Sequence, residues 1–290
     1  MQNLSDSRFG ESEPVYSRVL VGVGGSERSY VALRYALELA RQGTQPLRAL
    51  VVRTPPAGSV LALGSVPGYR EWLDDAARLA RRSVLAIEAE IHRLAEECGA
   101  PVSVEHATGM ARDCLVEAAV SASCLVMGKR GHSGAHGGLL GSNTELVVRR
   151  TRIPILLTPQ KYVAPVRVTA AYAAKEAGAS VLSHAVELSR LYEAPLHLLT
   201  VARDRARLVD VQKRGREELA ARGHTAILES HSGRVADEIV AHARPETVLV
   251  MGAYGHARVY RMVLGSVTEE VIRRAPGPIL IAGRPRLHES

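Results

Sequence analysis

The sequence is poor in aromatic side chains, with one Trp and one Phe among 290 residues. Its hydrophobic core must therefore rest on Val, Leu, Ile and Ala. That aliphatic bias favours parallel strands buried on both faces. Hydrophobic residues make up 46% and charged residues 23% of the chain, as in globular proteins. The length is sufficient for two domains of ordinary size, each with its own core.

Cysteine is also scarce. Cys98, Cys114 and Cys124 form no CxxC pair and leave an odd count, which argues against a disulfide framework or a zinc site and fits a reducing compartment. No apolar run is long enough to span a bilayer, and residues 1–14 contain no apolar signal core. We therefore expect a cytoplasmic protein with no membrane partner and no metal site.

The formal net charge is +7, and nearly all of the positive charge is Arg. These Arg residues are spread along the helical patterns instead of forming one block. The pattern favours solvated helix faces that attract small anions, and it makes nucleic acid an unlikely partner.

A long internal repeat is the strongest feature of the sequence. The tetrapeptide at 125–128 (LVMG) recurs at 249–252, an offset of 124. At the same offset and without a gap, the segments LGS, TE, RR and PIL also recur. A period of this length indicates a duplicated domain.

The beginnings of the two halves agree more loosely, at an offset of 149, so the first half has an insertion. The Gly/Pro-rich stretch 54–69 and a longer following helix account for it. A polar linker bounded by prolines spans 159–165. The sequence thus predicts a tail at 1–14 and domains at 15–160 and 161–286.

Short apolar strands alternate with helices in both halves, which predicts a parallel sheet covered on both faces. The expected strands are 18–23, 47–52, 102–106, 124–127, 153–157, 166–171, 195–201, 225–230, 247–251 and 278–282. The expected helices are 30–41, 71–97, 113–121, 142–149, 179–191, 205–222, 235–243 and 266–274.

A glycine motif follows the fourth strand of each half, where open α/β sheets bind ligands. It reads Gly-x-x-Gly, nine residues, Gly-Ser. Its glycines let backbone N–H groups approach phosphate oxygens, and the helix that follows adds unpaired N–H groups and partial positive charge. Hydroxyls of Ser142, Thr144, Ser266 and Thr268 add donors. Basic side chains make both loops electropositive: Lys129, Arg130, His132, His136, His256, Arg258 and Arg261.

Part of this pattern also has a purely structural interpretation. Ser142-x-x-Glu145 and Ser266-x-x-Glu269 read as helix capping boxes, which need no ligand. Two copies with the same nine-residue spacing weaken that interpretation, because generic turns and caps do not preserve such a spacing.

The glycine motif, preceded by Val-Met, resembles the ATP-binding signature of universal stress proteins, and the resemblance runs from about residue 19 to 281. It implies an α/β fold of two tandem Rossmann-like domains, similar to the adenine nucleotide alpha hydrolase fold. Each has a five-stranded parallel sheet of order 3-2-1-4-5 with helices on both faces. It implies ATP as the ligand, with or without Mg²⁺, and pairing of the two domains along their last strands, as in a homodimer. It leaves open a further homodimer and an unidentified protein partner.

The first-strand turn departs from the family. Gly24 stands where ATP-binding relatives carry an Asp that contacts the nucleoside, and Ala173-Ala174-Lys175 replaces the turn in the second half. The phosphate side is intact in both halves. The resemblance assigns the adenine nucleotide to Gly24, Gly25, Ser26, Val52, Gly109, Met127, Gly128, Lys129, Arg130, Gly131, His132, Gly141, Ser142, Asn143 and Thr144 of the first half. In the second half it assigns Val201, Gly233, Met251, Gly252, Gly255, His256, Gly265, Ser266, Val267 and Thr268.

Three other functions compete with a regulatory nucleotide. An ATP pyrophosphatase loop is only faintly suggested by Gly24-Gly25-Ser26, and neither a Walker A motif nor a dinucleotide fingerprint follows the first strands. Slow ATP hydrolysis is a second possibility, but the sequence shows no obvious carboxylate pair beside the phosphate loops to hold Mg²⁺, and no clear general base. A nucleotide-free interaction module with vestigial loops is the remaining alternative.

Overall fold

The computed structural model describes residues 15–41, 43, 45–53, 69–129, 142–175, 177–253 and 264–283, with only the backbone given for 69–81 and 142. The first half runs β1 (Val19–Gly22), α1 (Glu27–Ala40), β2 (Leu47–Arg53), α2 (Tyr69–Cys98), β3 (Val102–Thr108), α3 (Ala111–Ala119), β4 (Cys124–Gly128), α4 (Ser142–Arg150) and β5 (Ile155–Thr158). The second runs β6 (Arg167–Ala171), α5 (Gly178–Leu191), β7 (Leu196–Val201), α6 (Arg205–Ala221), β8 (Ile227–His231), α7 (Val235–His242), β9 (Thr247–Gly252), α8 (Ser266–Arg274) and β10 (Ile279–Ala282).

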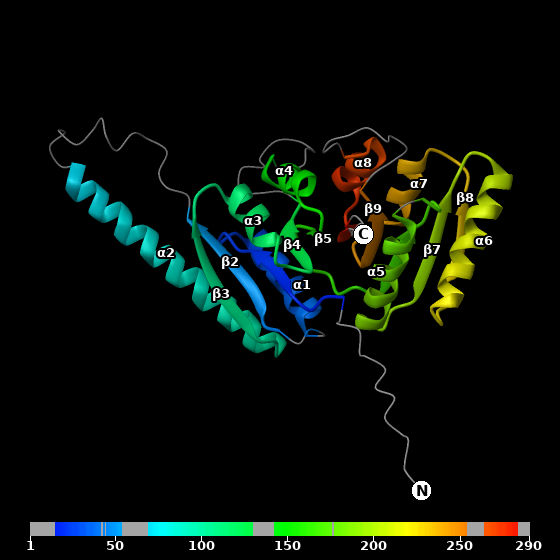
Figure 1. Cartoon of the computed structure of the whole chain (residues 1–290). Coiled ribbons are helices and arrows are strands. Elements are labelled where there is room, and N and C mark those ends of the chain that lie inside the picture. The colour runs from blue at the N-terminus through cyan, green and yellow to red at the C-terminus, as the bar shows by residue number, and fades with distance from the viewer. Residues whose placement is uncertain are drawn as a thin grey trace, which may run out of the picture.

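The strands form one ten-stranded sheet in the order β3-β2-β1-β4-β5-β10-β9-β6-β7-β8 (Figure 1). Each half therefore has the predicted order 3-2-1-4-5, and its strands are parallel. The halves meet where β5 and β10 pair antiparallel, with Leu156 opposite Leu280. Pairing along the last strands is thus confirmed within one chain.

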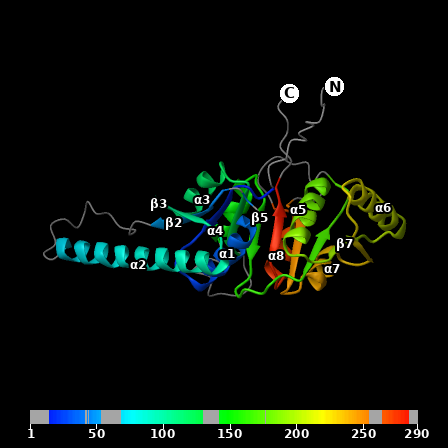
Figure 2. The same ribbon diagram turned by 90° about the horizontal axis from the view of Figure 1, so that it is seen from below.

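Helices cover both faces of the sheet, as the aliphatic strands predict. One face packs under α1, α2, α5 and α6 through side chains such as Leu33, Ile91 and Leu182. The other packs under α3, α4, α7 and α8 through Leu115 and Val271, among others. In the view from below, α2 and α3 lie on opposite sides of the strands of the first half, and α5 and α7 lie on opposite sides of those of the second (Figure 2).

The first half owes its greater length partly to α2, which has 30 residues against 17 in its counterpart α6. The predicted longer helix is confirmed, whereas most of the stretch 54–69 lies outside the described residues. No helix within the described ranges is long and apolar enough to cross a membrane. All three cysteines are free.

Helix α1 begins three residues before its predicted start, because Ser26 caps it. The Ser26 hydroxyl accepts a hydrogen bond from the Ser29 N–H at 3.2 Å, and the Ser29 hydroxyl accepts one from the Ser26 N–H at 3.0 Å. This reciprocal pair is a capping box in which Ser takes the place of the usual Glu.

Candidate functional site

The ends of β4 and β9 lie at the point where the strand order reverses in each half. β4 pairs with β1 on one side and β5 on the other, and β9 pairs with β6 and β10 in the same way. In open α/β sheets this edge is where ligands bind. Gly128 and Gly252 are the last residues of these strands, so the sheet places both predicted glycines at the ligand edge.

A threonine in the following helix fixes each of these strand ends. Thr144 Oγ1 donates to the Gly128 carbonyl at 3.1 Å, and Thr268 Oγ1 donates to the Gly252 carbonyl at 3.1 Å. The side chains are only 1% and 3% exposed. Their hydroxyl hydrogens are therefore committed to the backbone and not to a phosphate, which corrects the predicted role. These threonines hold the helix N-terminus next to the strand end.

The helix start itself corrects the predicted capping box. The N-cap of α8 is Gly265, and no side chain caps it, so Ser266 is the first helical residue and its side chain is exposed. In α4, Glu145 pairs with Arg149 at 2.6 Å. The first N–H groups of α8 are therefore not capped by a side chain of their own helix, which is the arrangement an anion needs. Asn143 and Val267, the second residues of these helices, are half-buried.

The first-strand turns of the two halves have related backbones but different side chains. Gly25 has φ +75°, and Ala174 at the equivalent position of the second half has φ +47°. A Cβ added at Gly24 would meet no atom of the described residues within 4 Å, so these residues leave the position of the missing Asp open. The Ser26 hydroxyl accepts from the first turn of α1, whereas α5 has no side-chain cap at all.

The remaining described candidates lie along the same edge. Gly109, with φ +150°, donates its N–H to the Arg53 carbonyl at 2.9 Å, at the end of β2. At Gly233, its counterpart, an added Cβ would lie 2.6 Å from a carboxylate oxygen of Glu238. The side chains of Val52 and Val201 are half-buried against the α3/α4 and α7/α8 layer. Met127 and Met251 are core residues of that layer, 7% and 4% exposed.

Several predicted residues lie outside the described part of the chain: Arg130, Gly131, His132, His136, Gly141, Gly255, His256, Arg258 and Arg261. Ser142 is described only by its backbone, as the first residue of α4.

A cavity of about 470 Å³ lies beside Gly128, between the two halves. The first half lines it with the ends of β4 and β5 and with Arg28 of α1, and the second half with the end of α8. Among its described lining residues there are five basic side chains and no acidic one: Arg28, Lys129, Lys161, Arg273 and Arg274. A cavity with this lining favours an anionic ligand.

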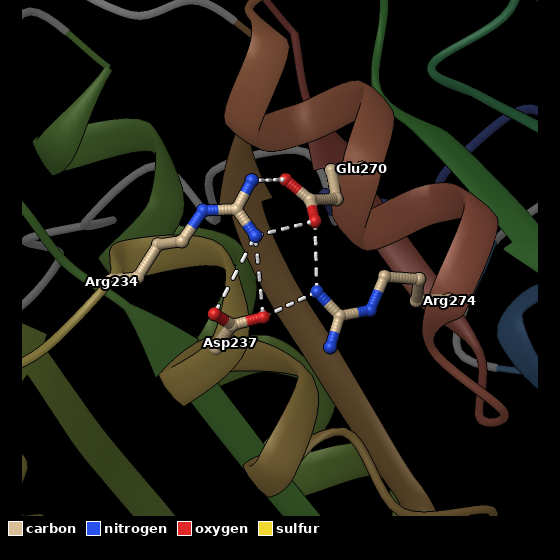
Figure 3. Close-up of polar contacts among 4 residues, drawn as sticks. All are labelled: Arg234, Asp237, Glu270 and Arg274. Atoms are coloured by element: carbon tan, nitrogen blue, oxygen red, sulfur yellow. Dashed lines mark hydrogen bonds and ion pairs between the residues drawn. The ribbon is translucent and has the colours of Figure 1, made fainter.

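Two of these cations are already engaged by the protein. Lys129 Nζ donates to the carbonyls of Ala275 at 2.7 Å and Gly277 at 2.5 Å, so it caps the C-terminus of α8 across the interface. Arg274 belongs to an ion-pair network with Arg234, Asp237 and Glu270 that joins α7 to α8 (Figure 3). Hydrogen bonding from Arg274 lowers the pKa of Asp237 below its ordinary value.

Arg273 and Lys161 are the better candidates to meet a ligand. Both side chains are exposed, and neither has a carboxylate partner within 4 Å among the residues that the structure describes. The glycine motif gives no signal for these residues or for Arg28, because the cavity forms only when the two halves pair.

The corresponding place in the second half has a much smaller pocket among the described residues. The pocket between Ala253, Arg152 and Gly283 has a volume of about 10 Å³. Gly283 approaches the first half so closely that an added Cβ would lie 2.5 Å from the Arg152 carbonyl oxygen. The first half has Pro159 at the equivalent position and Lys129 in place of Ala253. The two ligand edges are thus unequal.

Comparisons with known proteins agree with this architecture. The model of the Universal stress protein family matches residues 16–159 and 167–283. Universal stress protein Slr1230 of Synechocystis sp. is 30% identical over 184 residues, which are 62% of this chain and 64% of that protein. The match therefore spans less than two thirds of the Synechocystis protein.

Universal stress protein MJ0531 of Methanocaldococcus jannaschii is 28% identical over 155 residues, 52% of this chain and 87% of that protein. A universal stress protein from Archaeoglobus fulgidus has a crystal structure with a TM-score of 0.70 and 25% identity. That similarity covers 93% of this chain and 99% of the other.

Proposed function

The chain belongs to the universal stress protein family, and on that premise we propose that it binds an adenine nucleotide as a regulatory ligand, with little or no turnover. The ligand is ATP, with or without Mg²⁺, and the setting is the stress response in the cytoplasm. The two nucleotide-binding domains of the proposal are residues 15–160 and 161–286.

The observation that supports this function most strongly is the shared geometry of the two strand ends. Gly128 and Gly252 end equivalent strands at the switch point, and Thr144 and Thr268 hold them to the following helix by hydrogen bonds of the same length. A helix N-terminus held at a glycine strand end presents N–H groups and positive potential to phosphates.

The first half is the stronger candidate for the nucleotide. Its edge opens into the basic cavity of about 470 Å³, whereas the equivalent pocket of the second half measures about 10 Å³. The cavity has no carboxylate among its described lining residues, so Mg²⁺ would be held by the phosphates and water, as is common for this ion.

The alternative, a nucleotide-free interaction module, has specific support in the second half. There the pocket measures only about 10 Å³, and helix α5 begins at Gly178 without a side-chain cap. We therefore assign the nucleotide to the first half and leave the second as the half that fits a docking role.

A pair of matched variants tests this assignment. Gly265 has φ −63° and ψ 142°, which any L-residue adopts, so Gly265→Val leaves the backbone intact. We expect Gly141→Val to weaken binding of a fluorescent ATP analogue at least about tenfold by obstructing the phosphates, and Gly265→Val to change it little. Equal affinity of wild type and Gly141→Val would count against the first site.

A further inference from the structure

A cluster of metal-ligating side chains lies at the outer edge of the second half, away from the glycine motif. Glu229 and His231 come from β8, the last strand of the sheet, and His242 comes from the C-terminal end of α7. One ligand atom from each of the three lies within 4.8 Å of the others, and all three residues are partly buried.

Glu229 uses only one of its two carboxylate oxygens. Oε1 lies 2.8 Å from His197 Nδ1 and 3.8 Å from the Arg167 guanidinium. Oε2 is buried and has no hydrogen-bond partner among the described residues. A buried carboxylate oxygen without a partner costs free energy unless a proton or a cation neutralises it.

His242 is oriented so that its lone pair faces this oxygen. Its Nδ1 lies 2.7 Å from the Glu238 carbonyl, and because a carbonyl can only accept, Nδ1 carries the hydrogen. The neutral ring then has its lone pair on Nε2, which is 3.4 Å from Glu229 Oε2. A backbone acceptor on the far ring nitrogen is the arrangement that orients metal-binding histidines.

His231 completes the set of donors. Its ring centroid lies 4.6 Å from that of His242, and its Nδ1 lies 3.6 Å from Glu238 Oε2. A tetrahedral zinc site with bonds of about 2.0–2.1 Å has ligand atoms about 3.3–3.4 Å apart. The separation of the His242 and Glu229 ligand atoms already matches this value.

The first half provides an internal comparison. It keeps the carboxylate as Glu105 but has Ala107 and Ala118 where the second half has His231 and His242. There Arg48 satisfies both carboxylate oxygens, at 2.6 and 3.0 Å, and the second half has His197 in place of that arginine. One half thus neutralises the carboxylate with a guanidinium, and the other surrounds it with imidazoles.

We propose that Glu229, His231 and His242 form a binding site for a divalent transition metal, with Zn²⁺ as the ion best suited to two imidazoles and a carboxylate. Glu238 Oε2 or water supplies the fourth ligand. The site differs from the sequence expectation of no metal, which weighed cysteine spacing and not histidines from separate elements.

Titration of the chelator-treated full chain with Zn²⁺, without nucleotide, tests the proposal. We expect one equivalent to bind, Zn²⁺ to raise the melting temperature, and Co²⁺ to give the visible absorption of a tetrahedral site. His242→Ala should weaken Zn²⁺ binding about a hundredfold. His92→Ala, an exposed histidine on α2, is the matched control and should bind as wild type.

A variant with the residues of the first half at these positions controls for loss of binding through misfolding. His197→Arg with His231→Ala and His242→Ala restores the arginine–carboxylate pair, so it should melt cooperatively and lose Zn²⁺ binding. Zn²⁺ affinity equal to that of wild type in this variant would overturn the proposal. A second result would also overturn it: wild type does not bind Zn²⁺, and its melting temperature depends on pH in a way that His242→Ala abolishes. In that case a proton, and not a metal ion, neutralises Glu229.

Discussion

At the scale of single residues, Gly24 is the position that bears most on how the proposed first site would contact a nucleoside. The family resemblance places an Asp at this position, and an added Cβ meets no atom within 4 Å in the part of the chain that the structure describes. The neighbouring Gly25 supplies the left-handed φ of +75° that the turn needs, so the turn keeps its shape without the Asp. The missing group is the carboxylate alone.

Gly24→Asp should therefore strengthen nucleotide binding. A charged hydrogen bond to the nucleoside contributes about 1.5–3 kcal/mol, which corresponds to about a tenfold or greater gain in affinity. Equilibrium titration with ATP measures it, and Gly24→Asn serves as the neutral control. An unchanged affinity in Gly24→Asp would mean that the nucleoside does not reach this turn.

His184 is a second residue with a measurable consequence. It lies in α5 of the second half, is 8% exposed, and forms a 3.2 Å hydrogen bond with the Tyr16 hydroxyl of the first half. Burial lowers the pKa of His184 from 6.5 to about 4. The folded protein therefore holds this ring neutral, in contact with the other half.

Acidification should weaken the fold through this residue. The folded-state pKa lies below the unfolded one, so the stabilisation is complete above about pH 6.5 and is lost as the pH falls toward 4. At pH 4.5 we expect wild type to lose about 2–3 kcal/mol more than His184→Gln, relative to pH 7. Urea unfolding at the two pH values checks this, and equal losses in both proteins would show that His184 titrates normally.

At the scale of secondary-structure elements, the end of α8 joins the two halves through Lys129. The motif predicts a phosphate ligand here, but the ammonium donates to the Ala275 and Gly277 carbonyls. It thereby neutralises the negative end of the α8 dipole inside the cavity. Arg273 and Lys161 are left as the cations best placed for a ligand.

We therefore expect Lys129→Met to lower the stability of the fold more than it lowers the affinity for ATP. Each of the two lost charged hydrogen bonds costs at most about 1.5–3 kcal/mol, and water that hydrates the freed carbonyls reduces this cost. The free energy of unfolding in urea measures the loss. Unchanged stability together with a tenfold loss of ATP affinity would restore Lys129 to the phosphate site.

The elements themselves were predictable, because short aliphatic strands and intervening helices carry a strong local signal. The α8 cap was not: Ser-x-x-Glu matches the capping-box pattern with Ser266 as the N-cap, yet the helix begins one residue earlier than that pattern requires, with Gly265 as the N-cap. The hydroxyls of Thr144 and Thr268 were also misassigned, since sequence alone does not reveal the strand-end carbonyls that they reach.

At the scale of the whole molecule, the pairing of β5 with β10 turns two repeats into one continuous sheet (Figure 1). The antiparallel junction places the carboxyl ends of one half's strands beside the amino ends of the other's. The cavity and its partial closure arise there from residues more than a hundred positions apart, such as Lys129 and Ala275. The resemblance predicted the pairing, but no motif reports such contacts.

The same junction makes the molecule asymmetric. Pro159 and Lys129 border a cavity of about 470 Å³ in the first half, whereas Gly283 and Ala253 border a pocket of about 10 Å³ among the described residues of the second. A duplicated chain in which only one copy keeps an open site fits a single nucleotide per molecule.

The most direct test of this account is a calorimetric titration of the nucleotide-free full chain with Mg-ATP. The account predicts one site per chain, lost in Gly141→Val and retained in Gly265→Val. Two equal sites would contradict the asymmetry, and no heat of binding at millimolar ATP would contradict the nucleotide proposal itself.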